Sequence, residues 1–294
     1  MKKKKRPVGL WIFLIIIALI AGFFGWMAFT AHTVHLKRAV VSIPDLPPGF
    51  EGKTILYVSD IDLRRPSDAT RAGELVHRLE AAKPDILILG GGYTSPTLTQ
   101  LLDEKQKVSE EALQARTDFF HYISDFKAPL GRYALDGPSD GNGLSTTLAA
   151  CGYTLINDEK FLVESGGDRL WLVGVTANSE KARLYGKAFN KEDTVIVACD
   201  TPDTFPTLIT TEAGNSGHWV DLCLAGGTHG GQIRLFNRTL LTLKPLEQQY
   251  ISGWSRETGV PMLTSMGLGC RGLYLRLNTV PEVWLIQLTA AALE

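Results

Sequence analysis

The stretch Leu224-Ala225-Gly226-Gly227-Thr228-His229-Gly230-Gly231-Gln232-Ile233 breaks an apolar, strand-like run into a loop with four glycines around one histidine. Glycine lets the backbone turn sharply and come close to a ligand. A histidine held at such a turn can be a metal ligand. On these residues alone, a tight hairpin with a solvated histidine is the plainer interpretation. The rest of the chain has to decide what the loop does.

Strands and helices alternate in the first half of the chain. Short apolar runs predict strands at 54–59, 85–89 and 132–135, and helical patterns predict helices at 67–82, 109–126 and 144–151. Further strands are expected near 160–164, 169–175, 194–199, 219–225, 232–242, 261–266, 272–277 and 282–288. Alternation implies an α/β fold with a largely parallel sheet and helices outside, and the β-rich remainder adds a second sheet.

Acidic residues follow several of these strands, where functional loops of such sheets are expected. Asp60 and Asp62 follow the first strand and project to the same side, so they can share a cation; an N-cap and a solvated turn explain them equally well. Asp140 closes a run of turn residues after the third strand. Asp200 follows the strand at 194–199.

The N-terminus has the pattern of a membrane anchor. Residues 2–6 are five consecutive cations, and residues 8–31 carry no charge, which is long enough to cross a bilayer. Trp11 and Trp26 lie near the two ends, where interfacial aromatic residues are expected. We therefore predict a cytoplasmic basic segment (1–7), a transmembrane helix (8–31), a linker (32–52) and one extracytoplasmic domain (53–290) in the cell membrane.

Composition excludes several classes of protein. The formal net charge is −1, so no basic excess indicates a nucleic-acid partner. The four cysteines are far apart and include no CxxC pair, which favours buried free thiols over disulfides or structural zinc. A position outside the membrane suits a lipid head group, a wall precursor or another membrane protein as partner, and the sequence does not choose among them.

The order of these motifs resembles the calcineurin-like metallophosphoesterases, and most closely the membrane-associated branch whose last motif reads Gly-His-Thr-His-Gly-Gly-Gln. The resemblance covers about residues 53–289 and is carried by the segments at 84–85, 131–134, 228–232 and 281–282. It implies a two-sheet β-sandwich flanked by helices. In an active member, loops at the strand ends hold two metal ions that bind a phosphate ester and activate water.

Most of the metal ligands that the resemblance implies are replaced in this chain. The first motif, Asp-x-His, reads Asp60-Ile61-Asp62, and Asp200 stands where a later motif has histidine. Four family positions are vacated: the bridging aspartate, the asparagine and histidine of the third motif, and the first histidine of the last motif correspond to Gly92, Pro138, Ser139 and Gly227. One metal site is therefore expected to be lost. Asp60, Asp62 and His229 are the donors left for a single Mn²⁺, Fe²⁺, Zn²⁺ or Mg²⁺.

Three functions are compatible with this pattern. The chain is expected to be a non-catalytic binding or scaffold pseudoenzyme, with no cofactor or one divalent metal. The alternative is a phosphoesterase with a rebuilt single-metal site at Asp60, Asp62 and His229, in which Asp200 or Asp140 acts as general base. A third hypothesis is a structural domain whose old cleft is filled or solvated. Convergence of the carboxyl groups and the imidazole would discriminate among them.

Overall fold

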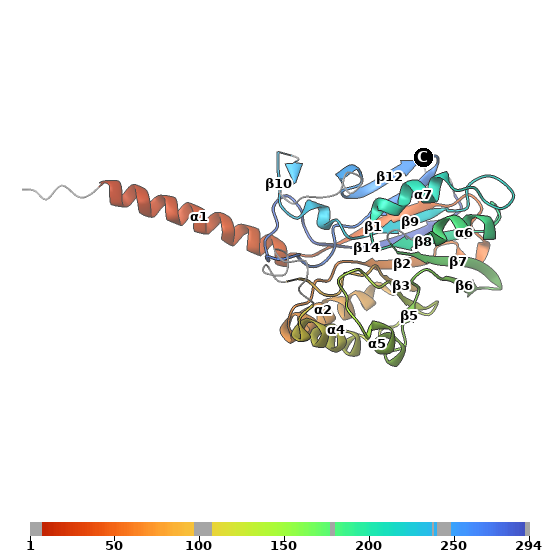
Figure 1. Cartoon of the computed structure of the whole chain (residues 1–294), viewed down its shortest axis with the longest axis horizontal. Coiled ribbons are helices and arrows are strands. Elements are labelled where there is room, and N and C mark those ends of the chain that lie inside the picture. Colours follow the sequence, from red (N-terminus) through yellow and green to blue (C-terminus); the bar gives the residue numbers. More distant parts are fainter. Residues whose placement is uncertain (1–7, 97–107, 177–179, 237, 240–247, 292–294) are drawn as a thin grey trace, which may run out of the picture.

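Two six-stranded mixed sheets form the centre of the molecule in a computed structural model that describes residues 8–96, 108–176, 180–236, 238–239 and 248–291 (Figure 1). The first sheet has the order β1 (His35–Ser42), β14 (Glu282–Thr289), β2 (Thr54–Val58), β3 (Ile86–Leu89), β4 (Arg132–Ala134) and β5 (Thr154–Leu155). The second has the order β12 (Gly253–Glu257), β13 (Val260–Thr264), β9 (Leu222–Ala225), β8 (Val195–Cys199), β7 (Asp168–Val175) and β6 (Lys160–Ser165).

Helices cover the outer face of each sheet. The first sheet is covered by α2 (Pro66–Leu79), α4 (Glu110–Tyr122) and α5 (Leu144–Ala150), and the second by α6 (Lys181–Ala188) and α7 (Phe205–Thr210) (Figure 1). Short elements complete the domain: η1 (Pro48–Phe50), η2 (Glu80–Ala82), η3 (Pro202–Thr204), η4 (His229–Gly231) and the hairpin of β10 (Arg234–Leu235) and β11 (Arg238–Thr239). The predicted α/β fold, a two-sheet sandwich flanked by helices, is confirmed.

Alternation along the strands produces the layers. In β2, Leu56 and Val58 belong to the core beneath α2 and α4, whereas Ile55 and Tyr57 belong to the core between the sheets. Successive side chains of a strand point to opposite faces, so a strand with helices on one side and a sheet on the other must be apolar throughout. Burial of each such side chain stabilises the fold by roughly 1.5–3 kcal/mol.

Several segments differ from the sequence-based expectation. The elements β5, α6, α7 and β12 were not predicted, and the strand expected at 232–242 is the hairpin of β10 and β11 in its described part, while 237 and 240–242 lie outside the described residues. Within the expected linker 32–52, residues 35–42 form the edge strand β1, which pairs in parallel with β14 from His35↔Glu282 to Ser42↔Thr289. The prolines that suggested a linker lie after this strand. The strand expected at 272–277 is absent from that described segment, where only an isolated bridge joins Leu277 to Ile233. Turns and loops replace it because Arg276 is buried there among backbone carbonyl groups.

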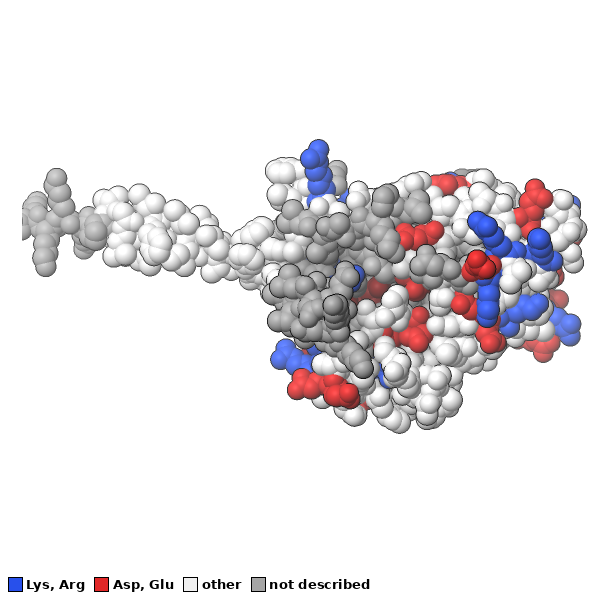
Figure 2. Space-filling model, viewed as in Figure 1, with Lys and Arg blue, Asp and Glu red and all other residues white. Residues whose placement is uncertain are grey.

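A single long apolar helix, α1 (Val8–His32), projects from the domain. It is long and apolar enough to cross a membrane, and no charged side chain lies along it (Figure 2). Its last turns dock on the domain: Met27 and Ala31 are buried, and the Met27 carbonyl accepts the Arg276 N–H at 3.2 Å. The predicted basic segment, residues 1–7, lies outside the described residues.

Candidate functional site

A cleft of about 270 Å³ opens where strands of both sheets end. The loops after β2, β3, β4, β8 and β9 all reach it. Parallel strands bring their carboxyl ends to one edge of a sheet, which is why residues far apart in sequence meet here. The side chains and backbone that line the cleft come from Asp60, Asp62, Gly92, Thr94, Pro96, Gly137, Pro138, Ser139, Asp200, Thr201, Gly227, His229 and Arg271.

Three of the predicted donors converge in this cleft. Nδ1 of His229 lies 3.3 Å from Oδ2 of Asp62, and Nε2 of His229 lies 3.9 Å from Oδ1 of Asp60. All three side chains are buried. Their φ angles are +50°, +58° and +51°, in the left-handed region that non-glycine residues seldom adopt. Strain of this kind persists only where the surroundings enforce it, and it gathers at functional sites.

Burial sets the protonation of these groups. Burial raises the pKa of Asp60 to about 6, whereas the Gly227 N–H and the Ser59 hydroxyl lower it. Burial and then the charge of Asp60 raise the pKa of Asp62 to about 8. Burial lowers the pKa of His229 well below its ordinary value, and the charges of Arg276 and Arg271 add to this. The imidazole is therefore neutral at pH 7, and its contact with Asp62 is not an ion pair.

Asp60 is held by the backbone of the glycine loop. The Gly227 N–H lies 3.0 Å from each Asp60 carboxylate oxygen, and the Ser59 hydroxyl donates to Oδ2 at 2.8 Å. Gly227, where the resemblance implies a histidine, thus donates a backbone N–H to the Asp60 carboxylate. In contrast, Asp62 Oδ2 and His229 Nδ1 are buried without a hydrogen bond to any described residue.

The four vacated positions also line the cleft. Gly92, Pro138, Ser139 and Gly227 all line it, as their places in the motifs predict, and they bring neither a carboxylate nor an imidazole. The backbone is also too close for simple replacement. A Cβ at Gly92 would lie 3.0 Å from Asp60 Oδ1, and a Cβ at Gly227 would lie 2.6 Å from the Asp200 carbonyl oxygen. Both glycines have positive φ, +70° and +85°.

Asp140 is not a candidate base, contrary to the sequence-based expectation. Its fully buried carboxylate accepts backbone N–H groups from Gly92, Tyr93, Thr94 and Gly137, and it does not line the cleft. Burial raises its pKa to about 7 against the lowering effect of these hydrogen bonds. Its role is to tie the loop after β4 to the loop after β3. Asp200, by comparison, is buried in the cleft wall, in the place where the sequence predicted it.

The sequence analysis did not single out two arginines near the site. Arg276 is fully buried and donates to the carbonyl groups of His229, Met266 and Gly269, which fixes the histidine loop against the C-terminal loop. Arg271 is exposed at the mouth of the cleft. The sequence signal for Arg276 was its position inside an apolar run. An arginine buried there needs several hydrogen-bond acceptors around its guanidinium, which indicates a structural role.

A two-metal centre does not fit these residues, because Gly92, Pro138 and Gly227 bring no side-chain ligand to the cleft and Ser139 brings only a hydroxyl group. Three donors suited to one cation do meet. Nevertheless, no group of three or more His, Cys, Asp or Glu side chains in the described part of the chain has the geometry of a metal site. The donors instead face one another across 3.3 and 3.9 Å.

Fold and site together define a four-layer α/β protein with a polar cleft at the strand ends. No family model matches the chain. Two curated relatives match along most of their length: the uncharacterized metallophosphoesterase YkuE of Bacillus subtilis (strain 168), 24% identical over 86% of this chain and 84% of the relative, and an uncharacterized metallophosphoesterase of Aquifex aeolicus (strain VF5), 26% identical over 92% and 97%. The chain is thus similar, over most of its length, to these two metallophosphoesterases.

Solved structures give weaker likenesses. The phosphopantetheinyl hydrolase PptH from Mycobacterium tuberculosis aligns with a TM-score of 0.41 and 9% identity over 74% of this chain and 91% of its own. A 5'-nucleotidase from Candida albicans SC5314 aligns with a TM-score of 0.39 and 10% identity over 74% and 46%.

Proposed function

We propose that the chain is a membrane-anchored pseudoenzyme of the calcineurin-like, Gly-His-Thr-His-Gly-Gly-Gln branch of the metallophosphoesterases, which acts as a binding or scaffold module. The observation that carries this proposal is that Gly92, Pro138, Ser139 and Gly227 line the cleft without a carboxylate or an imidazole. Two-metal hydrolysis requires ions that clamp both the attacking and the leaving oxygen. These four positions offer no such side chain to hold the second ion, and Gly227 engages Asp60 through its backbone instead.

Phosphodiester turnover tests the loss of catalysis. The purified full chain is assayed with bis(p-nitrophenyl) phosphate in the presence of Mn²⁺, Fe²⁺, Zn²⁺ or Mg²⁺, beside the variant His229→Ala. The expected rate equals that of the variant and of buffer with each metal. Metal-dependent turnover by the natural chain that disappears in His229→Ala would overturn the proposal.

The anchor is the second part of the proposal. The apolar helix α1 and the five cations before it support a single span with a cytoplasmic N-terminus and an extracytoplasmic domain. All four native cysteines are buried, so the exposed Glu164 offers a place for a reporter. In intact cells, Glu164→Cys should react with a membrane-impermeant maleimide. Labelling that requires cell lysis would show that the domain is cytoplasmic, contrary to the proposed orientation. Release of the chain from membranes by alkaline carbonate would show that it is not an integral membrane protein, contrary to the proposed anchor.

A specific observation also favours the alternative, a phosphoesterase with one cation at Asp60, Asp62 and His229 and with Asp200 as general base. Buried polar atoms without a hydrogen bond are costly, and Asp62 Oδ2 and His229 Nδ1 are such a pair. A bound cation would satisfy both. If this alternative holds, elemental analysis should find about one ion per chain, and that ion should raise the melting temperature in the natural chain but not in His229→Ala. A metal-free chain whose melting temperature no divalent ion changes would exclude it.

A further inference from the structure

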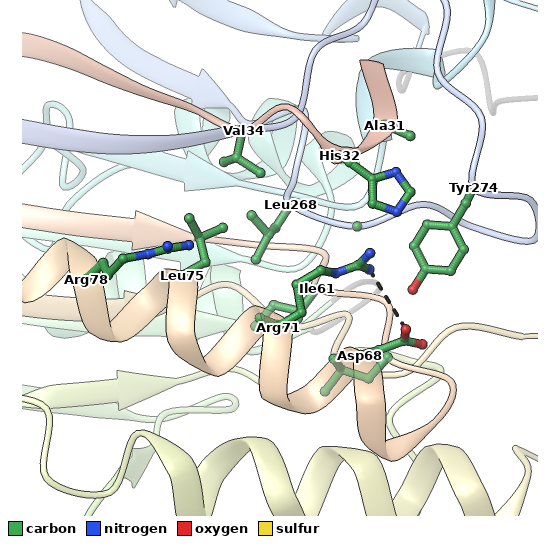
Figure 3. A pocket seen from close by; sticks show the side chains of 13 residues that line it. Ala31, His32, Val34, Ile61, Asp68, Arg71, Leu75, Arg78, Leu268 and Tyr274 are labelled. Atoms are coloured by element: carbon green, nitrogen blue, oxygen red, sulfur yellow. Dashed lines mark ion pairs between the residues drawn. The ribbon is translucent and has the colours of Figure 1, made fainter. Parts of the chain in front are cut away.

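A second cavity lies between the end of α1, one face of α2 and the loop at 268–274 (Figure 3). Its volume is about 290 Å³, at the low end of the roughly 300–1,000 Å³ typical of ligand pockets, so it suits one chain of a lipid better than a whole lipid. It is separate from the candidate cleft: Ile61 lines this cavity, whereas its neighbours Asp60 and Asp62 line the cleft.

One stripe of α2 faces the cavity. Asp68, Arg71, Leu75 and Arg78 all line it, at spacings of three, four and three residues that keep them on one side of a helix. Figure 3 shows them in a row along α2, with Arg71 paired to Asp68 at 3.8 Å. Arg78 forms no ion pair with any residue that the structure describes. The stripe thus presents two cations on either side of an apolar side chain.

The inner part of the cavity is apolar. Ile61, Leu63 and Leu268 line it and are buried. At the rim, the Tyr274 ring lies 4.4 Å from the guanidinium of Arg64 and 5.2 Å from that of Arg71. An apolar interior with a cationic rim matches an amphiphile that has a hydrocarbon chain and an anionic head.

The cavity also lies where the chain leaves the membrane in the proposed function. Ala31 and His32, the end of α1, form part of its lining. Because Met27 and Ala31 are buried against the domain, the proposed span would place this face next to the bilayer. Arginine side chains next to a membrane surface attract anionic lipids.

We propose that this cavity binds one anionic phospholipid of the adjacent leaflet, with an acyl chain against Ile61 and Leu268 and the phosphate near Arg71 and Arg78. The inference rests on the proposed membrane anchor and not on the loss of catalysis. A lipid is the occupant because the apolar interior, the cationic rim and the end of the span meet at one place.

Photocrosslinking tests the proposal with the full chain in phosphatidylcholine vesicles. The probe is phosphatidylglycerol with a diazirine in one acyl chain, and phosphatidylcholine with the same diazirine is the neutral comparison. We expect the charged probe to label peptides that contain Ile61, Leu75 or Leu268 more than the neutral probe does. Arg71→Gln and Arg78→Gln should each reduce that labelling roughly fivefold. Leu75→Trp should block labelling by either probe, because it fills the cavity.

Arg65→Gln is the matched control. Arg65 lies 3.8 Å from Asp68, as Arg71 does, but it does not line the cavity, so its variant should label like the natural chain. Equal labelling in Arg65→Gln, Arg71→Gln and Arg78→Gln, or crosslinks confined to α1, would overturn the lipid site. Flotation with the vesicles distinguishes failure of the lipid site from failure of the anchor. A chain that floats but shows no labelled cavity peptides is anchored and has no lipid site. A chain that does not float contradicts the proposed membrane anchor.

Discussion

The two walls of the candidate cleft are built from the same kind of loop, yet only one brings carboxylates and an imidazole. After β2 and β9, Asp60, Asp62 and His229 point their donors at one another. After β3 and β4, Gly92, Pro138 and Ser139 occupy the corresponding positions with neither carboxylate nor imidazole.

The difference teaches that backbone contacts can fix the shape of the cleft even where its lining has no carboxylate or imidazole. In the wall without donors, the backbone is still fixed, because Asp140 collects four N–H groups from two loops. In the wall with donors, the backbone is held at positive φ by its neighbours. One wall lacks carboxylates and imidazoles while the backbone of both walls is fixed, an arrangement that supports the proposed binding role.

The largest effect is expected from Asp140→Ala, which removes the carboxylate that joins the loops after β3 and β4. The change removes the acceptor of four buried N–H groups, so the free energy of unfolding should fall by about 3–5 kcal/mol. Chemical denaturation of the full chain measures it. Asp136→Ala is the control on the same loop, because no hydrogen bond of its carboxylate to a described residue is lost. Similar losses in both variants would show that the carboxylate of Asp140 does not organise the two loops.

An intermediate effect is expected from Gly227→Ala, which probes how closely the loop after β9 approaches the loop after β8. The added Cβ would meet the Asp200 carbonyl oxygen at 2.6 Å in a backbone with φ of +85°. Stability should fall by about 2–4 kcal/mol. Gly259→Ala isolates the backbone contribution, because Gly259 has φ of +91° and open space around it, and should cost about 1 kcal/mol. Equal denaturation midpoints for the two variants would mean that the loops around Asp200 and Gly227 are not in contact.

Much of the fold could be predicted because the spacing of apolar residues along the chain indicates the strands and helices. Apolar runs such as 54–59 and 85–89 are buried on both faces, and such strands stand out in sequence. β1 could not be predicted as readily, since its residues lie between an apolar helix and three prolines. Its place in the sheet depends on pairing with β14, more than 200 residues away, which no local pattern reports.

The site was predictable in position but not in orientation. The rule that functional loops lie at strand ends brought Asp60, Asp62, Asp200 and His229 to one cleft. The rule does not predict whether a carboxylate points into the cleft, because its orientation depends on the backbone angles and on the N–H groups within hydrogen-bonding distance. Asp140 therefore looked like a base and proved to be a tie between loops.

The smallest effect is expected at the opposite end of β9, where Asp221 gives a buried carboxylate outside the cleft for comparison. Burial, with the charge of Asp45 adding to it, raises the Asp221 pKa to about 6 against the lowering effect of the Val195 N–H at 2.7 Å. A raised carboxyl pKa means that the folded chain binds the proton more tightly than the unfolded chain does. Stability is then full below about pH 4 and declines as pH rises to about 6.

Asp221→Asn should abolish this decline, because the amide keeps an acceptor for Val195 and carries no charge to bury. The variant should match the natural chain at pH 4 and exceed its stability by about 1–2 kcal/mol at pH 7, as denaturation midpoints at each pH would show. Asp193→Asn is the control, since Asp193 also accepts a backbone N–H at 2.7 Å but in an exposed turn. If the gain at pH 7 were the same in both variants, it would reflect net charge rather than burial. A gain confined to Asp221→Asn would show that burying a carboxylate in this fold costs stability outside the cleft as well, so the cost at Asp60 and Asp62 needs no bound ion to explain it.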